Sequence, residues 1–467
     1  MVAANLAPTA GPPKGSIVPL ATAGLLIGML LSVLDQTVVA IALPAIAEEL
    51  GGMDEIGWIV TAYVLAMTAT GTLYGRISDR FGRRPVFVTA VALFVVGSVL
   101  CGMVDTAPQL VAARTFQGIG AGALFVLPTI ALSELYPQRL RSRIQGFTGV
   151  VFALATVGGP LAGGAITDAW GWRWIFFINI PLGLLAIGLA AYALRLPKPG
   201  GGGGKIDLPG AVLIAGATVS LLLAAEWGGR TFAWTSGVIL GLLGGVAVLV
   251  ALFVWRERRA ANPLLPLRLF ADPTVRVVLP ATLLLGALLS GSLIYLPTYL
   301  QGNYGMGATQ AGLALNPYVL TFMAVSSIAG ARIGASGRFK PYLIGGAAIT
   351  VAGLVLLSRL TPGTPYVVLA LELAVLGVGF GLLAQNLVVV AQNAVSPEDL
   401  AATTSAVVSV RGLGLSIGVS LFATLLTREL QNQGTTQAAA VIPDVLFWGI
   451  PVAVLMVALI TLLPRKT

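Results

Sequence analysis

The chain has 467 residues, of which 57% are apolar and 10% are charged, whereas an ordinary soluble domain carries about 25% charged residues. No water-soluble fold of this length could bury so many apolar side chains, so the composition excludes a soluble protein and indicates an integral membrane protein. The formal net charge is +9, which by itself could indicate a nucleic-acid partner or a basic membrane face.

Apolar runs follow one another along the chain, separated by Gly, Pro and clusters of charge. The first residues (1–15) contain too little charge and too many prolines for a secretory signal, so they predict a short cytosolic tail. A bilayer span needs about 20 mostly apolar residues. On this criterion the sequence predicts fourteen spans, at 17–47, 55–76, 85–104, 108–135, 143–168, 172–194, 208–227, 235–255, 275–300, 308–332, 341–359, 365–394, 400–427 and 444–464.

The basic residues predict the orientation of these spans. With the spans placed as above, 21 of the 27 Lys and Arg residues fall in loops on one side, 4 fall on the other side, and 2 lie inside spans. Cytosolic loops retain Lys and Arg, so both termini are expected to be cytosolic in a multi-pass protein of the cytoplasmic membrane. The basic excess is thus a topology signal, and no nucleic-acid partner is expected.

The two parts of the chain resemble each other at an offset of about 255 residues. The segment "RISDRFGRRP" at 76–85 matches "RIGASGRFKP" at 332–341, and "GIGAG" at 118–122 matches "GVGFG" at 377–381. Spans one to six thus correspond to spans nine to fourteen, and spans seven and eight are an insertion. The expected divisions are a tail (1–15), an N-terminal six-helix bundle (16–195), a Gly/Pro linker (196–206), two inserted helices (207–260) and a C-terminal six-helix bundle (261–467).

Two homologous six-helix halves are the usual plan of secondary transporters, which bind their substrate near the midplane between the halves. A membrane-embedded enzyme would need His, Cys or paired carboxylates grouped on span faces. The chain has no histidine and one cysteine, Cys101, so no enzymatic activity, no metal site and no cofactor is expected. The glycine run at 200–204 lacks the spacing of a phosphate loop and is interpreted as part of a flexible linker.

The loop after the second span, "GRISDRFGRRP", concentrates arginine in a short turn. Asp79 is expected to accept hydrogen bonds from a neighbouring helix N-terminus. Arg83 and Arg84 are expected to pair with an acid such as Glu134 near the end of span four, although these arginines could instead only set topology. The conformational motif predicted here comprises Gly75, Asp79, Arg80, Gly82, Arg83, Arg84 and Glu134.

This loop resembles the cytosolic loop signature of the major facilitator superfamily, and other segments resemble its 14-helix drug:proton antiporter family. The resemblance covers essentially the whole chain. It implies a major facilitator fold, all-α with 14 transmembrane helices arranged as two six-helix bundles plus two inserted helices. It also implies proton-coupled efflux of lipophilic, often cationic, small molecules such as antimicrobials. The matching segments are "LDQTVVAIALP" (34–44), "RTFQGIGAG" (114–122), "GGPLAGG" (158–164), "WRWIFFINIPLG" (172–183) and "LPTYLQ" (296–301).

The segment "GGPLAGG" resembles the antiporter motif of that family. Glycines along one face let helices approach closely, and Pro160 is expected to kink the span; the resemblance implies that the bend blocks a proton leak, the alternative being tight packing alone. Ala155 departs from a glycine in the family pattern, and the tenth span offers Asn316 where some multidrug members have an acid. The motif residues are Gly159, Pro160, Gly163 and Gly164.

Asp35 lies near the middle of an otherwise apolar first span. A carboxylate at mid-membrane costs at least ~2.5–3.5 kcal/mol on insertion scales, so it should face a cavity or a partner and have a function. Gln36 and Thr37 beside it make one face polar, and Arg114 in span four is the candidate partner. We expect Asp35 to alternate between a proton and the exported substrate; the structural alternative is a buried ion pair with Arg114.

Glu372 is the second acid inside a span and aligns next to Arg114 across the repeat. It is expected to bind substrate or carry a proton, or to pair with Arg411, which alternatively extends to the cytosolic face. Aromatic side chains near the proposed cavity could stack on a flat or cationic ligand, or serve in packing. The predicted substrate-binding residues are Asp35, Gln36, Trp58, Tyr63, Tyr295, Tyr318, Phe322 and Glu372, and the predicted proton-coupling residues are Asp35, Arg114 and Glu372.

The sequence therefore predicts a monomeric exporter whose partners are protons, membrane lipid and a small-molecule substrate. One alternative is a dedicated proton-coupled exporter of a lipid, metabolite or siderophore, which would differ in cavity shape. A second alternative is a transport-inactive membrane scaffold or receptor. The presence of Asp35 and Arg114 and the lack of a soluble domain argue against the second alternative.

Overall fold

The structure is a computed structural model, and it describes residues 17–51, 53–196, 207–229, 231–260, 262–435 and 437–464. The predicted tail and nearly all of the predicted linker lie outside these residues. No β-strand occurs within the described ranges. The helices are α1 (Val18–Leu50), α2 (Met53–Phe81), α3 (Arg83–Gly102), α4 (Ala107–Leu135), α5 (Gln138–Trp170), α6 (Trp174–Phe177), α7 (Asn179–Ala193), α8 (Leu208–Trp227), α9 (Gly237–Glu257), η1 (Leu267–Ala271), α10 (Pro273–Tyr304), α11 (Ala308–Ala314), α12 (Asn316–Ser336), α13 (Lys340–Leu357), α14 (Tyr366–Leu383), α15 (Asn386–Ala394), α16 (Leu400–Gln433), α17 (Ala438–Phe447) and α18 (Gly449–Thr461).

These helices match the predicted spans. Within the described ranges, thirteen segments are long and apolar enough to cross a membrane, and α2, with 29 residues, adds the remaining span. Four predicted spans are each formed by two consecutive helices: α6 with α7, α11 with α12, α14 with α15, and α17 with α18. In hydrocarbon every backbone N–H and C=O must be paired within its own segment, so apolar runs of this length fold as helices. The expected fold class, an all-α membrane protein, is confirmed.

Polar and small residues mark where several helices begin and end. The Asp272 carboxylate accepts hydrogen bonds from the amides of Thr274 and Val275, at 2.7 and 3.2 Å, at the start of α10. These bonds satisfy two of the amides that a helix N-terminus leaves unpaired. Gly337 and Gly434 adopt left-handed conformations directly after α12 and α16, a geometry that glycine adopts without steric cost.

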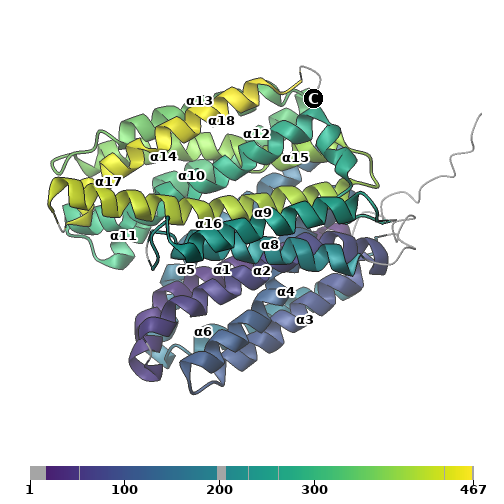
Figure 1. The fold of residues 1–467 in the computed structure, drawn as a ribbon, viewed down its shortest axis with the longest axis horizontal. Helices are drawn as coiled ribbons and strands as arrows, with labels where there is room; N and C mark the ends of the chain where they lie inside the picture. The colour runs from purple at the N-terminus through teal and green to yellow at the C-terminus, as the bar shows by residue number, and fades with distance from the viewer. Residues whose placement is uncertain are drawn as a thin grey trace, which may run out of the picture.

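The helices form two groups, one above the other in Figure 1. The N-terminal group contains α1 to α7, drawn in purple and blue, and the C-terminal group contains α10 to α18, drawn in green and yellow. The inserted helices α8 and α9 lie along the boundary, where α8 packs against α2 and α16. The largest buried apolar cluster is built only from residues of the C-terminal group. The main N-terminal cluster includes Leu400, Ala401 and Val408 of α16, so the groups share apolar packing there.

One end of the molecule carries the turns that are rich in arginine and lysine. This basic end, as we call it, holds the turns between α2 and α3, between α4 and α5, and between α12 and α13. In Figure 1 it is the side on which α18 ends, near the label C. Lys340 at the start of α13 donates hydrogen bonds to the carbonyl oxygens of Thr461 and Leu463, at 2.7 and 2.5 Å, which places the end of α18 there too.

The two groups meet where α2 packs against α16 and where α5 packs against α12. Thr72 Oγ1 donates to Ser409 Oγ at 2.9 Å, and Arg141 Nη1 donates to Asn393 Oδ1 at 3.5 Å. These contacts lie in the parts of the helices nearer the basic end. The structure therefore holds the two groups together at the basic end.

Candidate functional site

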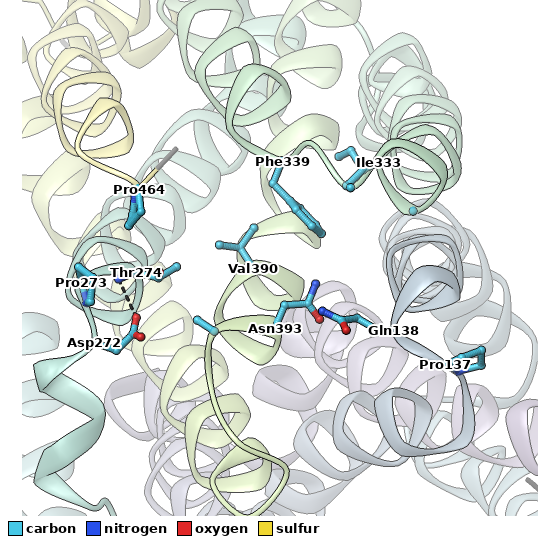
Figure 2. A pocket seen from close by; sticks show the side chains of 13 residues that line it. Pro137, Gln138, Asp272, Pro273, Thr274, Ile333, Phe339, Val390, Asn393 and Pro464 are labelled. Carbon is cyan, nitrogen blue, oxygen red and sulfur yellow. Dashed lines mark hydrogen bonds between the residues drawn. The ribbon is translucent and has the colours of Figure 1, made fainter. Parts of the chain in front are cut away.

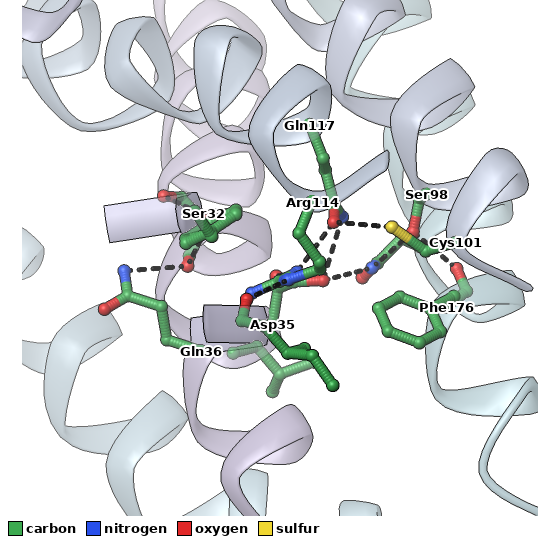
Figure 3. A network of polar contacts seen from close by, with 12 residues as sticks. Ser32, Asp35, Gln36, Ser98, Cys101, Arg114, Gln117 and Phe176 are labelled. Carbon is green, nitrogen blue, oxygen red and sulfur yellow. Dashed lines mark hydrogen bonds and ion pairs between the residues drawn. The ribbon is translucent and has the colours of Figure 1, made fainter. Parts of the chain in front are cut away.

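Asp35 is the centre of a network of polar side chains inside the N-terminal group (Figure 3). Its Oδ2 accepts a hydrogen bond from Arg114 Nη1 at 2.5 Å, and its Oδ1 accepts bonds from Gln117 Nε2 at 2.9 Å and Asn179 Nδ2 at 3.0 Å. Asp35 is 2% exposed and Arg114 is fully buried. The ion pair proposed from the sequence is therefore present, and α1, α4 and α7 all contribute to it.

Arg114 is held on several sides. Its Nη1 also donates to Gln117 Oε1 at 2.7 Å, and its Nε donates to the carbonyl oxygen of Ile59 at 3.4 Å. The guanidinium carbon lies 3.9 Å from the centroid of the Tyr63 ring, a cation–π arrangement. Tyr63 in turn donates its hydroxyl to the Ser32 carbonyl oxygen at 3.3 Å. A buried charge pair is tolerated only when its remaining donors and acceptors are satisfied, and this network supplies such partners.

Sequence reasoning missed Gln117 and Asn179. Asn179 Nδ2 also lies 2.9 Å from Ser98 Oγ, and Ser98 donates to the carbonyl oxygen of Phe176 at 2.8 Å, so α3 and α6 are tied to the network. The signal was available for Gln117, because it follows Arg114 by one helical turn and is a polar residue in an apolar span. The same reasoning applies to Asn179 in the predicted sixth span.

The position of Asp35 differs from the expectation that it contacts substrate. Both of its carboxylate oxygens are engaged within the N-terminal group, and Asp35 does not line the cavity between the two groups. The next residue, Gln36, does line that cavity. Consecutive residues of an α-helix point about 100° apart, since one turn holds about 3.6 residues. Asp35 therefore turns into the N-terminal group while Gln36 faces the C-terminal group.

The cavity between the groups has a volume of about 90 Å³. Helices α1, α2, α4 and α5 form one wall and α16 forms the other. Drug-sized ligands occupy pockets of about 300–1,000 Å³, so the cavity must widen before it can hold one. Its lining residues are Val33, Gln36, Met67, Thr68, Gly71, Gly122, Phe125, Val126, Phe152, Val408, Ser409, Arg411, Gly412 and Leu415.

Arg411 lines this cavity, a position that the sequence did not predict. The expected alternatives were an ion pair with Glu372 or a side chain that extends to the membrane surface. Among the described residues Arg411 forms no ion pair with Glu372, and it is only 7% exposed. Glu372 lies on α14, where its Oε2 is buried and has no hydrogen-bond partner among the described residues. The repeat aligned Glu372 next to Arg114, but in the structure Glu372 on α14 and Arg411 on α16 lie in different surroundings.

Gln36 is the one predicted substrate residue that lines the cavity described above. Trp58 instead packs edge-on against Trp227 of the inserted helix α8, with ring centroids 5.8 Å apart. Tyr63 stacks on Arg114, and Tyr295 donates to the carbonyl oxygen of Val419 at 3.5 Å.

The remaining aromatic candidates lie within the C-terminal group. Tyr318 packs on Phe322 and Phe380, with centroid distances of 6.1 and 6.2 Å, and it is 4% exposed. Phe322 is buried as well. The sequence identified spans that bear aromatic residues, but it could not fix the rotation of each helix about its axis. That rotation decides whether a side chain faces the cavity or the core.

A second cluster of charges lies at the basic end of the N-terminal group. Arg83 Nη2 lies 2.6 Å from Asp79 Oδ1 and 2.7 Å from Glu134 Oε1. Its Nη1 donates to the carbonyl oxygen of Gly75 at 3.3 Å and also to Ser78 Oγ. Arg83 therefore joins the end of α2, the start of α3 and the end of α4, as predicted for its pairing with Glu134.

Two expectations about this loop are wrong. Asp79 binds the side chains of Arg83 and Arg76, and no helix N-terminal amide donates to it among the described residues. Arg84 is exposed and forms no ion pair there, and Arg80 lies 5.3 Å over the Phe81 ring. Gly82 explains the difference: its φ of +94° turns the chain so that Arg83 folds back onto α2.

The antiporter-like segment of α5 packs against α1 beside Asp35. A Cβ atom on Gly159 would overlap Thr37 Oγ1 and lie 2.6 Å from Thr37 Cβ, and a Cβ on Gly163 would lie 3.1 Å from Val38 Cα. Thr37 Oγ1 also donates to the carbonyl oxygen of Ala155 at 3.1 Å. The predicted close approach of helices at this motif is therefore present. Nothing lies within 4 Å of a Cβ placed on Gly164, and the side chain of Pro160 lies outside the described residues.

A larger cavity, of about 880 Å³, lies at the basic end, lined mainly by the C-terminal group and also by Pro137 and Gln138 of the N-terminal group (Figure 2). Phe339 and Ala394 line it, and in the aligned repeats these residues take the places of Arg83 and Glu134. The C-terminal group thus has apolar side chains and open space where the N-terminal group has its charge cluster. The two halves are not equivalent at the basic end.

Comparisons with known proteins agree with this architecture. A family model of the Major Facilitator Superfamily matches residues 25–206 and 210–419. An "Uncharacterized MFS-type transporter" of Mycobacterium tuberculosis is 40% identical over 424 residues, which cover 90% of this chain and 61% of that protein. The "Multidrug transporter protein MdtP" of Bacillus subtilis is 32% identical over 409 residues, which cover 88% of this chain and 75% of that protein. The chain therefore spans about three fifths of the length of the mycobacterial relative.

Among solved structures, the human organic anion transporter MFSD10 (TETRAN) superimposes with a TM-score of 0.67 at 16% identity, covering 94% of this chain and 100% of that one. At that identity the likeness concerns the fold alone. The family match includes Asp35, Arg114, Asn179 and Arg411. The family match, the relatives and the fold together show that the chain belongs to the major facilitator superfamily.

Proposed function

We propose that the chain is a proton-coupled exporter of lipophilic small molecules, of the 14-helix antiporter type, in the cytoplasmic membrane. The names of bacterial relatives that are multidrug transporters support the export of such molecules. The basic end would face the cytosol, because cytosolic loops retain Lys and Arg. Transport would then proceed by rocking of the two helix groups around the cavity between them.

The observation that carries this proposal is the buried Asp35–Arg114 pair, one residue away from the cavity. Asp35 is fully engaged inside the N-terminal group, Gln36 faces the cavity, and Thr37 contacts the glycine face of α5. A change at Asp35 can therefore alter both the cavity wall and the α1–α5 contact through α1. A carboxylate at this depth is the kind of group that carries protons in membrane transporters.

The coupling follows from the charge of the pair. While Asp35 is ionised, it balances Arg114 at a site that is shielded from solvent. A proton on Asp35 leaves the Arg114 charge unbalanced, and an unpaired buried charge costs about 3–5 kcal/mol. That cost favours an arrangement in which Arg114 is hydrated or finds another partner. Protonation of Asp35 would thus shift the balance between conformations, and inward proton flow would supply the drive.

The side chains that line the cavity indicate the chemical character of the substrate. Its walls are mostly apolar, as expected for lipophilic molecules. The family resemblance adds an expectation of cationic substrates, but no Asp or Glu is among the lining residues of this cavity. We therefore propose lipophilicity, and not positive charge, as the shared property of the substrates.

Efflux from proteoliposomes with an imposed pH gradient tests the proposal. Asp35→Asn is expected to abolish proton-driven efflux of a lipophilic fluorescent dye, whereas Asp168→Asn, at an exposed carboxylate of α5, should leave efflux unchanged. Fluorescence-detected gel filtration of both variants shows whether they fold. Full proton-driven efflux by folded Asp35→Asn would refute the role of Asp35, and no dye flux by the wild type under any gradient would favour the scaffold alternative.

A further inference from the structure

Arg411 is a buried charge that the Asp35 network does not include. It lies on α16 in the wall of the cavity between the two groups and is 7% exposed. Its Nη1 donates to the carbonyl oxygen of Ala384 at 3.3 Å, and its guanidinium carbon lies 5.2 Å from the centroid of the Phe125 ring. Among the described residues no carboxylate lies within ion-pair distance of it, whereas Arg83 has two such partners and Arg114 has one. Its charge is therefore unbalanced.

The depth of Arg411 makes this imbalance unfavourable. Arg411 is the twelfth residue of α16, which begins at Leu400. At about 1.5 Å per residue it lies roughly 16 Å along the helix axis, near the middle of a hydrocarbon core about 30 Å thick. Charged residues at such depth usually pair with one another or with backbone carbonyls, and they mark ion or substrate pathways. Among the described residues Arg411 donates to one backbone carbonyl, that of Ala384, and has no acid, so its other N–H donors are available to a molecule in the cavity.

The rest of the cavity wall fits a molecule with one anionic group and an apolar body. The neighbouring polar side chains are Gln36, Thr68 and Ser409, which can donate hydrogen bonds but carry no charge. The apolar side chains include two aromatic rings, Phe125 and Phe152. The wall therefore carries one positive charge, uncharged hydrogen-bond donors and surfaces on which a flat apolar group can pack.

We infer that Arg411 binds an anionic group of the transported molecule, so that the preferred substrates are amphipathic organic anions such as aryl carboxylates. Arginine presents its N–H donors as a planar fork that matches a carboxylate. The pairing would supply the counter-charge that the protein does not, and the same charge would repel cations. This inference rests on the proposed export function, and it replaces the expectation of cationic substrates for this chain.

Three probes with one fluorophore test the inference: dansylglycine, which is anionic, its neutral methyl ester, and the cationic dansylcadaverine. Binding to the purified protein is measured by dansyl fluorescence. We expect the wild type to bind dansylglycine more tightly than the other two probes. Arg411→Gln should weaken dansylglycine about 10- to 100-fold, the range for a lost hydrogen bond to a charged group, and leave the ester nearly unchanged. Arg411→Lys should retain part of the anion preference.

Arg428→Gln is the matched control, because Arg428 lies exposed on the same helix. Gln36→Glu, which adds an acid to the same cavity, should move the preference toward dansylcadaverine. Equal weakening of all three probes by folded Arg411→Gln, or a wild-type preference for dansylcadaverine, would overturn the inference. If the protein shows proton-driven flux but does not prefer the anionic probe, only the role of Arg411 is refuted. The anion preference without proton-driven flux refutes the export function and leaves the anion site standing.

Discussion

The Asp35–Arg114 pair makes a quantitative prediction about stability. Arg114→Met leaves the Asp35 carboxylate buried with only the side-chain amides of Gln117 and Asn179. Both charged side chains are 1% exposed, so water cannot replace the lost partner, and the expected loss is about 3–5 kcal/mol of unfolding free energy. The double variant Asp35→Asn/Arg114→Met has no buried charge left in this network, so it should recover at least half of that loss.

Cys101 provides the assay. It is the one cysteine of the chain, it is fully buried, and its Sγ lies 3.5 Å from Gln117 Oε1 at the edge of the network. A maleimide that fluoresces on reaction with a thiol therefore reports opening of this region in detergent. At a fixed temperature a loss of 3 kcal/mol corresponds to about a hundredfold faster labelling, if reclosing is fast relative to reaction. Labelling of Arg114→Met at the wild-type rate, or faster labelling of the double variant than of both single variants, would refute the reasoning.

Three further predictions concern the contacts between helices. Arg83→Gln should slow efflux and lower the melting temperature, because it leaves the Asp79 and Glu134 carboxylates without their shared partner. Arg84→Gln, at an exposed side chain, should change neither, and equal effects of the two variants would contradict the role of Arg83 in joining α2, α3 and α4. Gly159→Ala should cost about 1–3 kcal/mol and reduce transport, since its Cβ would overlap a hydroxyl of α1; unchanged melting and efflux would show that α1 and α5 are not as close as described. The hydroxyls of Thr72 and Ser409 lie 2.9 Å apart across the two groups, so cysteines at these two positions should form a disulfide in a cysteine-free background. This disulfide should stop efflux until a reductant is added, and efflux by the oxidised, cross-linked protein would show that the groups need not separate there.

Much of the fold could be predicted from the sequence because lipid leaves few choices. An apolar run of span length must form a helix in hydrocarbon, and the uneven distribution of basic residues and the internal repeat group the helices into two halves. The Asp35–Arg114 pair was predicted for a related reason: two opposite charges in apolar spans are each too costly alone. The pairing of Arg83 with Glu134 follows similarly from the few charges near that end of the bundle.

The tertiary structure decided what the individual side chains face. Hydropathy is nearly uniform around these helices, so it does not reveal how far each is rotated about its axis. Asp35 could therefore not be assigned to the N-terminal group and Gln36 to the cavity before the helices were packed. For the same reason the sequence could not show that Arg411 lines the cavity whereas Glu372 does not. It also could not show that Tyr318 packs in an aromatic core and not in the cavity wall. Composition and span length determine which segments cross the membrane, whereas one helix rotation of about 100° decides whether a polar side chain faces a partner inside its own group or the cavity between the groups.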